Sequence, residues 1–179
     1  YFELDRMGQL TDVHRKDTGL EIVSLAIAPV LPGRRRAELM AVGSVDNTVR
    51  VLSLKSTQPF VQLTLQAFPA QPHSLLITNM EDNNPEAFSL YVGLVNGVLF
   101  RSGISSTDAS LTDTRKRFLG PTPVKLFAVS VQEKNAVLAL SSRSWLAYNY
   151  QSKFQINPLS YEGLNYASAF SSEQCPEGL

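Results

Sequence analysis

Apolar residues occur along the chain in short runs of about four to eight, rich in Val, Leu, Ile, Phe and Tyr and bounded by Gly, Pro, Asn, Asp and Ser. Such runs between turn-forming residues are typical of β-strands. No window keeps a spacing of three to four residues with polar residues opposite, so long helices are not expected. The pattern predicts an all-β chain. The expected strands are Glu21–Ala28, Glu38–Gly43, Thr48–Leu54, Phe60–Gln66, Ser74–Thr78, Phe88–Leu94, Val98–Ser102, Arg115–Leu119, Val124–Ser130, Ala136–Ser141, Trp145–Gln151, Phe154–Pro158 and Tyr166–Ser171.

Three segments of the chain repeat one pattern. The segment Ala41–Leu54 (AVGSVDNTVRVLSL) is echoed by Tyr91–Gly103 (YVGLVNGVLFRSG), and a third copy occupies Ala136–Tyr150 (AVLALSSRSWLAYNY). Each copy has an apolar strand, a tight turn and a second apolar strand. The Asp, Asn and Gly of the first two turns suit the positive φ of a two-residue hairpin. The turns are expected at Asp46–Asn47, Asn96–Gly97 and Arg143–Ser144, which places them 50 and 47 residues apart.

A repeat of this length with four strands per unit is typical of a β-propeller, in which each repeat forms one blade. The inner strands read as nearly continuous apolar runs, which fits a blade packed on both faces by its neighbours. A β-sandwich built of hairpins is the alternative. A seven-bladed ring at about 45 residues per blade needs on the order of 300 residues. The 179 residues therefore predict about three four-stranded blades, part of a longer chain.

Composition narrows the class of function. The chain is 44% hydrophobic and 18% charged, which argues against disorder, and its formal net charge is zero. A neutral chain is not expected to hold nucleic acid or an anionic membrane over most of its surface, although a local patch remains open. The uncharged stretch Ser56–Met80 carries three prolines and His73, so we interpret it as two strands joined by a loop and not as a membrane span.

Candidate catalytic residues are few. The chain has two histidines, His14 and His73, and one cysteine, Cys175. No nucleophile motif surrounds them, no phosphate-binding Gly-rich loop is present, and one cysteine excludes an internal disulfide or a four-cysteine zinc site. We therefore expect no catalytic, cofactor-binding or metal-binding residue. The acidic loop around Glu81, Asp82 and Glu86 lacks the spacing of a calcium loop and is interpreted as a solvated connection.

Basic and aromatic clusters offer the remaining candidates. Arg34–Arg36 suits either an acidic partner or a solvated loop, and the loop is favoured. Arg115–Arg117 lies on an expected outer strand, where charge also protects an exposed edge from unwanted pairing. Trp145, Tyr148 and Tyr150 suit either base stacking or blade packing, and packing is favoured.

Longer segments resemble a known family. These are Ser141–Phe154 and Pro158–Leu179, supported by Tyr1–Leu10, Ala41–Leu54, Gln66–Leu75 and Asp113–Phe127. They resemble the splicing factor 3B subunit 3 family, within the wider family that includes the large subunit of the cleavage and polyadenylation specificity factor and damaged-DNA-binding protein 1. The resemblance covers almost the whole chain in order.

The resemblance implies three seven-bladed propellers threaded from one long chain. Residues 1–163 would belong to the middle propeller, and residues 164–179 would form its last strand and the start of the return toward the third. The implied role is a nuclear, non-catalytic scaffold of the splicing factor 3b complex, in the small nuclear ribonucleoprotein that recognises the branch site.

The implied partners are the HEAT-repeat splicing factor 3B subunit 1, the ten-kilodalton splicing factor 3B subunit and the PHD-finger-like subunit. RNA would be met mostly through other subunits, and no membrane is implied. No partner-binding residue is carried over to this chain. Two alternatives stay open: a ubiquitin-ligase adaptor resembling damaged-DNA-binding protein 1, which would dock a cullin, and a propeller hydrolase with a polar pocket on the ring axis.

Overall fold

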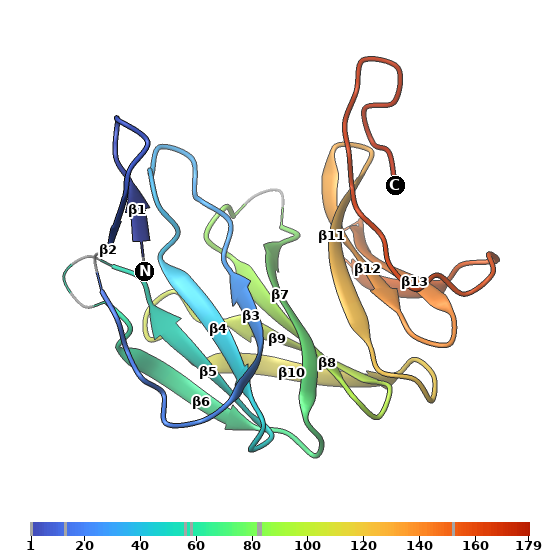
Figure 1. Ribbon diagram of the computed structural model, residues 1–179. Coiled ribbons are helices and arrows are strands. Elements are labelled where there is room, and N and C mark those ends of the chain that lie inside the picture. The colour runs from blue at the N-terminus through green and yellow to red at the C-terminus, as the bar shows by residue number, and fades with distance from the viewer. Residues whose placement is uncertain (1, 13, 56, 58, 82–83, 152) are drawn as a thin grey trace.

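The computed structural model describes residues 2–12, 14–55, 57, 59–81, 84–151 and 153–179, and this part of the chain is built of strands without helices. Twelve strands form three antiparallel sheets of four, each in chain order (Figure 1). The first sheet contains β3 Ile22–Ile27, β4 Leu39–Ser44, β5 Thr48–Ser53 and β6 Gln62–Ala67. The second contains β7 Pro72–Asn79, β8 Phe88–Leu94, β9 Val98–Ile104 and β10 Leu111–Phe118. The third contains β11 Lys125–Val131, β12 Lys134–Leu140, β13 Ser144–Tyr150 and β14 Lys153–Pro158.

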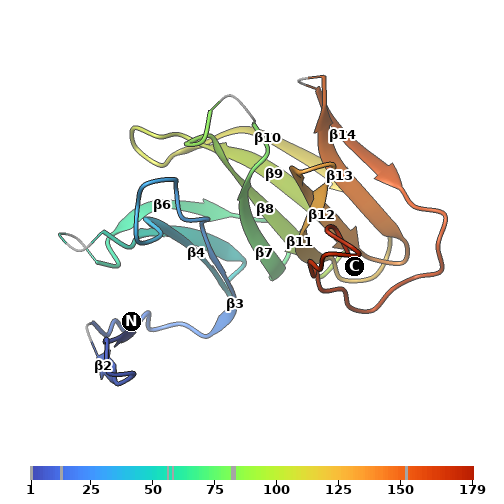
Figure 2. The same cartoon turned by 90° about the horizontal axis from the view of Figure 1, so that it is seen from above.

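The three sheets are arranged as neighbouring blades of a propeller. Seen from above, they fan out with β3, β7 and β11 on the inner side and β6, β10 and β14 on the outer side (Figure 2). The inner strand β7 contacts both β3 and β11. Two sheets of a sandwich would instead pack face to face across a single core. The expected all-β blade architecture is confirmed.

Each boundary between blades has its own apolar core, and the middle blade contributes to both. Along β8, Leu90 and Val92 are buried against the first blade, whereas Tyr91 is buried against the third. Successive side chains of a strand point to opposite faces, so a strand covered on both faces must be apolar at every position. This explains the continuous apolar run in the sequence.

The repeated hairpins differ from the expected two-residue turns. Three residues separate β4 from β5 and also β8 from β9, and only the last of each three, Asn47 or Gly97, has positive φ, at 62° and 80°. A type I turn followed by one left-handed residue is the common three-residue hairpin. In the third blade the loop is likewise three residues, and Ser144 already belongs to β13.

The Val-Gly pair of the repeat marks where the next blade approaches. A Cβ atom at Gly93 would lie 2.6 Å from the carbonyl oxygen of Val124, just before β11. A Cβ atom at Gly43 would lie 2.6 Å from Ser24 Oγ on β3 of the same blade and 3.1 Å from the side chain of Pro72, at the start of β7. The distance to the next blade therefore requires glycine at position 93, whereas at position 43 the neighbouring strand and the next blade both limit the space.

Both ends of the chain depart from the expected strands. At the N-terminus, β1 Phe2–Leu4 and β2 Leu10–Asp12 form a hairpin that is not among the expected strands. The Asp5 carboxylate stabilises its turn by accepting two backbone N–H groups at 2.8 Å. The strand expected over Tyr166–Ser171 is not formed, and Phe170 makes only an isolated bridge to Gly178. Without a neighbouring strand, this segment cannot satisfy a ladder of backbone hydrogen bonds.

The C-terminal tail, residues 159–179, lies against the face of the third blade that points away from the second blade (Figure 1). Leu159 and Ala167 pack on the apolar cluster that includes Leu138. The Glu177 carboxylate accepts the backbone N–H groups of Gln132 and Glu133 at the turn between β11 and β12. The tail therefore covers a face that a further blade would otherwise meet.

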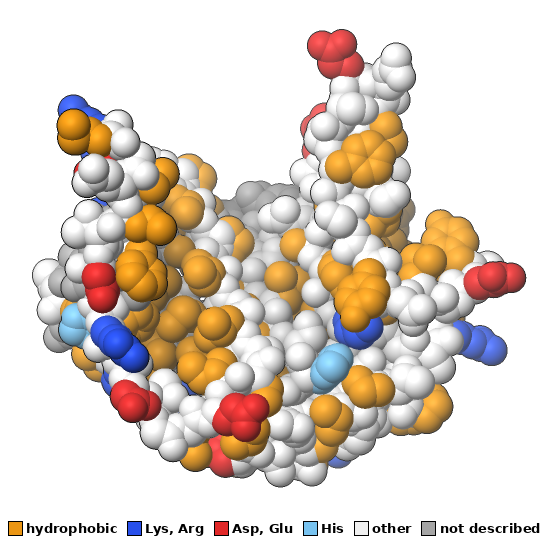
Figure 3. Space-filling model, viewed as in Figure 1, with side chains coloured by type: hydrophobic (Ala, Val, Ile, Leu, Met, Phe, Trp, Pro, Cys, Tyr) orange, Lys and Arg blue, Asp and Glu red, His pale blue; other side chains and the backbone are white. Residues whose placement is uncertain are grey.

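The corresponding face of the first blade is open. Leu25 and Ile27 on β3 are 56% and 61% exposed, and hydrophobic side chains gather in a hollow over this face (Figure 3). In a closed ring, each blade face is covered by the next blade. Exposed apolar surface of this kind is costly in water.

We expect the isolated 179-residue chain to melt over a broad range without a cooperative transition, because the open blade face and the free strand edges remain unpaired. Differential scanning calorimetry of the isolated chain checks this, with the longer protein as the control. A sharp transition at a temperature close to that of the longer protein would contradict the expectation.

Candidate interaction surfaces

The structure places the residues considered for catalysis in three different parts of the fold. The His14 ring lies 5.5 Å from the Phe60 ring beside the first blade, and His73 lies on β7 with its pKa lowered by partial burial and by the Lys125 charge. Cys175 is exposed in the tail. Among the described residues, no group of three or more His, Cys, Asp or Glu side chains could hold a metal ion. No described helix is long and apolar enough to cross a membrane.

The basic run and the acidic loop meet each other. Arg34 forms ion pairs with Glu38 and, at 3.2 Å, with Glu86 of the acidic loop. Asp82 lies outside the described residues. The pairing between Arg34 and Glu86 supports the interpretation of both segments as solvated loops.

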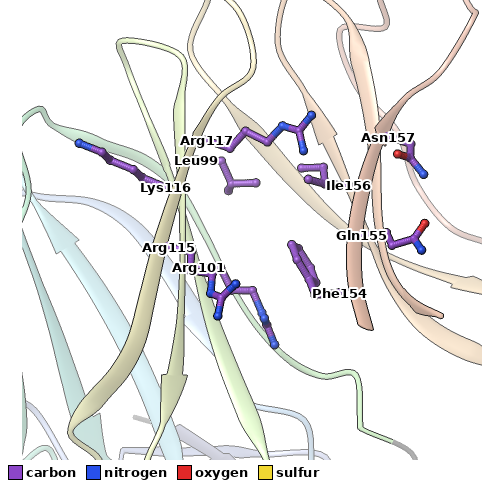
Figure 4. Close-up of a pocket in the computed structure, with 9 residues that line it drawn as sticks. All are labelled: Leu99, Arg101, Arg115, Lys116, Arg117, Phe154, Gln155, Ile156 and Asn157. Atoms are coloured by element: carbon purple, nitrogen blue, oxygen red, sulfur yellow. The ribbon is translucent and has the colours of Figure 1, made fainter. Parts of the chain in front are cut away.

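A groove of about 380 Å³ separates the outer strands of the second and third blades (Figure 4). Its walls come from β9, β10 and β14, and we call it the arginine groove. Its inward-facing residues are Leu99, Arg101, Arg115, Arg117, Phe154 and Ile156. Lys116, Gln155 and Asn157 border the groove and point away from it (Figure 4). Strand alternation explains the division, because inward-facing residues are two positions apart along each strand.

Two guanidinium groups of the groove lie over aromatic rings. The guanidinium carbon of Arg101 is 4.4 Å from the ring centroid of Phe154, and that of Arg117 is 5.2 Å from the ring of Trp145. The indole Nε1–H of Trp145 donates to the Leu119 carbonyl oxygen at 3.0 Å, which fixes the ring. These cation–π contacts hold both arginines between the blades.

The groove keeps unused hydrogen-bond donors. Arg101 Nη2 donates to Ser89 Oγ at 3.4 Å, while its buried Nε has no partner among the described residues. Arg115 contacts Asp113 at 3.2 Å, but both side chains are largely exposed. Exposed ion pairs of this kind contribute little. The groove is therefore a strongly cationic site, and the exposed guanidinium of Arg115 is the part of it that a ligand reaches first.

The aromatic residues of β13 do not form one stacking platform. Trp145 packs into the core shared with the second blade, whereas Tyr148 packs on the opposite face beneath the tail. Tyr150 is 57% exposed at the end of the strand. The packing interpretation is confirmed for Trp145 and Tyr148.

The open face of the first blade forms a second, apolar cleft of about 590 Å³. Its floor includes Ile22, Leu25, Ile27, Met40 and Leu52, and its rim includes Lys16 and Arg35. This is the face that a preceding blade would cover in a closed ring. The arginine groove is different, because both of its walls are present within these three blades.

Tyr91 is fully buried between the second and third blades, and its hydroxyl donates to Met80 Sδ at 3.0 Å. Burial raises its pKa to about 12, partly opposed by the Arg101 charge. The unfolded chain ionises its tyrosines near pH 10. The contribution of Tyr91 to the free energy of unfolding is therefore fully present below pH 10 and is lost as the pH rises toward 12. The loss is on the order of 2–3 kcal/mol.

We expect Tyr91→Phe to remove this part of the alkaline destabilisation. The measurement is the difference in urea midpoint between Tyr91→Phe and the unsubstituted longer protein, taken near pH 9 and again above pH 11. Tyr161→Phe serves as the control, since Tyr161 is 66% exposed. If the difference in midpoint were the same at both pH values, the pKa of Tyr91 would be the same in the folded and the unfolded protein, which would contradict the prediction.

A family model described as the RSE1/DDB1/CPSF1 second β-propeller matches residues 1–179. The chain belongs to this family. It is 48% identical over 190 aligned residues to splicing factor 3B subunit 3 of Danio rerio, 43% to spliceosome-associated protein 130 A of Arabidopsis thaliana and 43% to pre-mRNA-splicing factor prp12 of Schizosaccharomyces pombe. Each alignment covers all of this chain and 15–16% of the relative. The chain therefore spans about one sixth of the length of these relatives.

Membership of the RSE1/DDB1/CPSF1 family confirms the recognition made from Ser141–Phe154 and Pro158–Leu179, and it accounts for the three blades. It does not reveal the arginine groove. Arg101 and Phe154 carry no motif in the sequence and meet only because the second and third blades pack side by side. The one signal was the basic run Arg115–Arg117 on an outer strand.

Proposed function

We propose that the chain is part of the middle propeller of a non-catalytic scaffold subunit of the splicing factor 3b complex, which supports pre-mRNA splicing in the nucleus through protein–protein contacts. One observation carries the proposal: the similarity to proteins named as splicing factors extends over the whole chain in an animal, a plant and a fungus. Within this proposal, residues 1–163 form blades of the middle propeller, and residues 164–179 lead toward the third.

The proposed partners are the HEAT-repeat splicing factor 3B subunit 1, the ten-kilodalton subunit and the PHD-finger-like subunit, with RNA bound mostly through them. The neutral net charge supports a role based on protein contacts. The scattered positions of His14, His73 and Cys175 support a non-catalytic role. The propeller supplies rigid blades whose edges and grooves are available to partners.

The test is to tag the full-length protein, purify it from nuclear extract with and without ribonuclease, and identify its companions by mass spectrometry and RNA sequencing. We expect the other splicing factor 3b subunits in both preparations and the branch-site-recognising RNA only without ribonuclease. A cullin in place of splicing subunits would favour the ubiquitin-ligase adaptor instead. Polyadenylation factors without splicing subunits would assign the chain to another member of the family.

A further inference from the structure

The arginine groove holds more positive charge than protection of a strand edge requires. Lys116 is exposed on β10, points away from the groove, and already supplies a charge of the kind that protects a strand edge from neutral or basic strands (Figure 4). Arg101 and Arg117 instead lie between two blades, each over an aromatic ring. Side chains ordered in this way lose little further freedom on binding, so the groove is prepared for an anionic ligand.

One side of β10 is also open for backbone pairing. It is the outermost strand of its sheet, and no described strand pairs with its second edge. The N–H of Leu119 donates to the Gly97 carbonyl oxygen at 2.9 Å, and antiparallel pairing to β9 recurs at every second residue. The N–H groups of Lys116 and Phe118 therefore point away from β9.

These two features fit an extended polypeptide. A peptide strand added to the open edge of β10 would place alternate side chains on the groove side, opposite Arg115 and Arg117. Carboxylates at those alternate positions would meet the guanidinium groups with matched charge and planar geometry. Acidic residues on the other side of the same peptide would meet Lys116 alone.

Single-stranded RNA fits the groove less well. Its bases need free aromatic faces for stacking, and the arginines lie over the rings of Phe154 and Trp145. The amide groups of Gln155 and Asn157 are of the type that reads a base edge, but they point away and bond to the Tyr148 hydroxyl. The groove presents charge along a strand edge without a stacking surface.

We propose that the arginine groove binds an extended acidic segment of a partner protein, which adds as a strand to the free edge of β10 and places carboxylates on Arg115 and Arg117. No further blade is needed to complete the groove, because both of its walls are already formed by neighbouring blades. This site does not depend on which assembly the protein joins, so it stands or falls separately from the splicing role.

The test uses the full-length protein and a fluorescein-labelled peptide of eight residues, the length of β10, that alternates Glu and Thr. A peptide alternating Gln and Thr is the uncharged control. We expect the acidic peptide to bind, and to bind more weakly as salt rises from about 0.05 M to about 0.3 M. The double substitution Arg115→Glu with Arg117→Glu should weaken binding at least about tenfold. Lys116→Glu, the neighbouring charge on the opposite side of the strand, should weaken it by less than about threefold.

Hydrogen exchange distinguishes strand addition from a diffuse charge effect. On peptide binding, the amides of Lys116 and Phe118 should exchange about tenfold more slowly, whereas those of Arg115 and Arg117 are already bonded to β9. Unchanged protection of far strands in the double variant shows that it is folded. The proposal is overturned if the wild-type protein does not bind the acidic peptide, if Lys116→Glu is as damaging as the double variant, or if Lys116 and Phe118 gain no protection. Displacement of the peptide by oligouridine at equal concentration, with the same dependence on Arg115 and Arg117, would identify an RNA site and also overturn it.

Discussion

Gly97→Ala is expected to lower the free energy of opening of the second blade by about 4 kcal/mol or more. Gly97 has φ near 80°, and a Cβ atom there would lie 1.5 Å from the carbonyl oxygen of Gly120. That oxygen belongs to the connection between the second and third blades, where the N–H of Leu119 donates to the Gly97 carbonyl. The backbone at Gly97 or Gly120 must therefore shift, which disrupts the contact between the second and third blades. Native-state hydrogen exchange of β8 and β9 in the longer protein measures the change.

Asn47→Ala is the matched control, because Asn47 holds the same turn position in the first blade with φ near 62° and its carbonyl likewise accepts the N–H of Phe68. Asn47 already carries a Cβ atom, so alanine there adds only the cost of a left-handed conformation, about 1–2 kcal/mol. Gly97→Asn separates the two effects further, since Asn tolerates the positive φ but still introduces the overlap. Equal losses for Gly97→Ala and Asn47→Ala would show that the approach to Gly120 is not maintained in solution.

The comparison of these two turns shows what the sequence could predict. Asp46, Asn47, Asn96 and Gly97 identified the hairpins and their period, because turn chemistry is local and needs only residues close in the chain. The loop length was wrong by one residue, since a two-residue and a three-residue hairpin both place Asn or Gly at positive φ. The severe constraint on Gly97 comes from Gly120, a residue 23 positions away, and no local pattern reveals it.

The arginine groove was not predictable for the same reason. Strand alternation places Arg115 and Arg117 on one side of β10, but which blade they face depends on the packing of whole sheets. Arg101 and Phe154 are more than fifty residues apart and come together through that packing. The conformation of the tail could not be predicted for the same reason. Tyr166–Ser171 has the composition of a strand, but a strand forms only where a neighbouring strand is present to pair with it.

Leu90→Ala is expected to destabilise the propeller by about 3–5 kcal/mol. Leu90 is completely buried in the core between the first two blades, on a strand that is itself paired on both edges with β7 and β9. Its surroundings are held by two sheets, so the space left by the removed atoms cannot collapse easily, and the cavity cost adds to the lost burial. Leu65→Ala on β6 is the control; Leu65 is 47% exposed, and we expect a loss below about 1 kcal/mol.

The two substitutions Leu90→Ala and Leu138→Ala are also expected to differ in which strands lose hydrogen-exchange protection. Because Leu90 belongs to the core shared with Val49 and Val51 of the first blade, its truncation should lower hydrogen-exchange protection in β5 as well as in β8. Leu138→Ala removes an equally buried leucine from the cluster under the tail, which the first blade does not touch. In a repeat architecture, stability is transmitted mainly between nearest neighbours, so Leu138→Ala should leave β5 unchanged while weakening the third blade. If both substitutions lowered protection equally in all three blades, the blades would open as one cooperative unit, and the interface between the first two would not be the element that couples them.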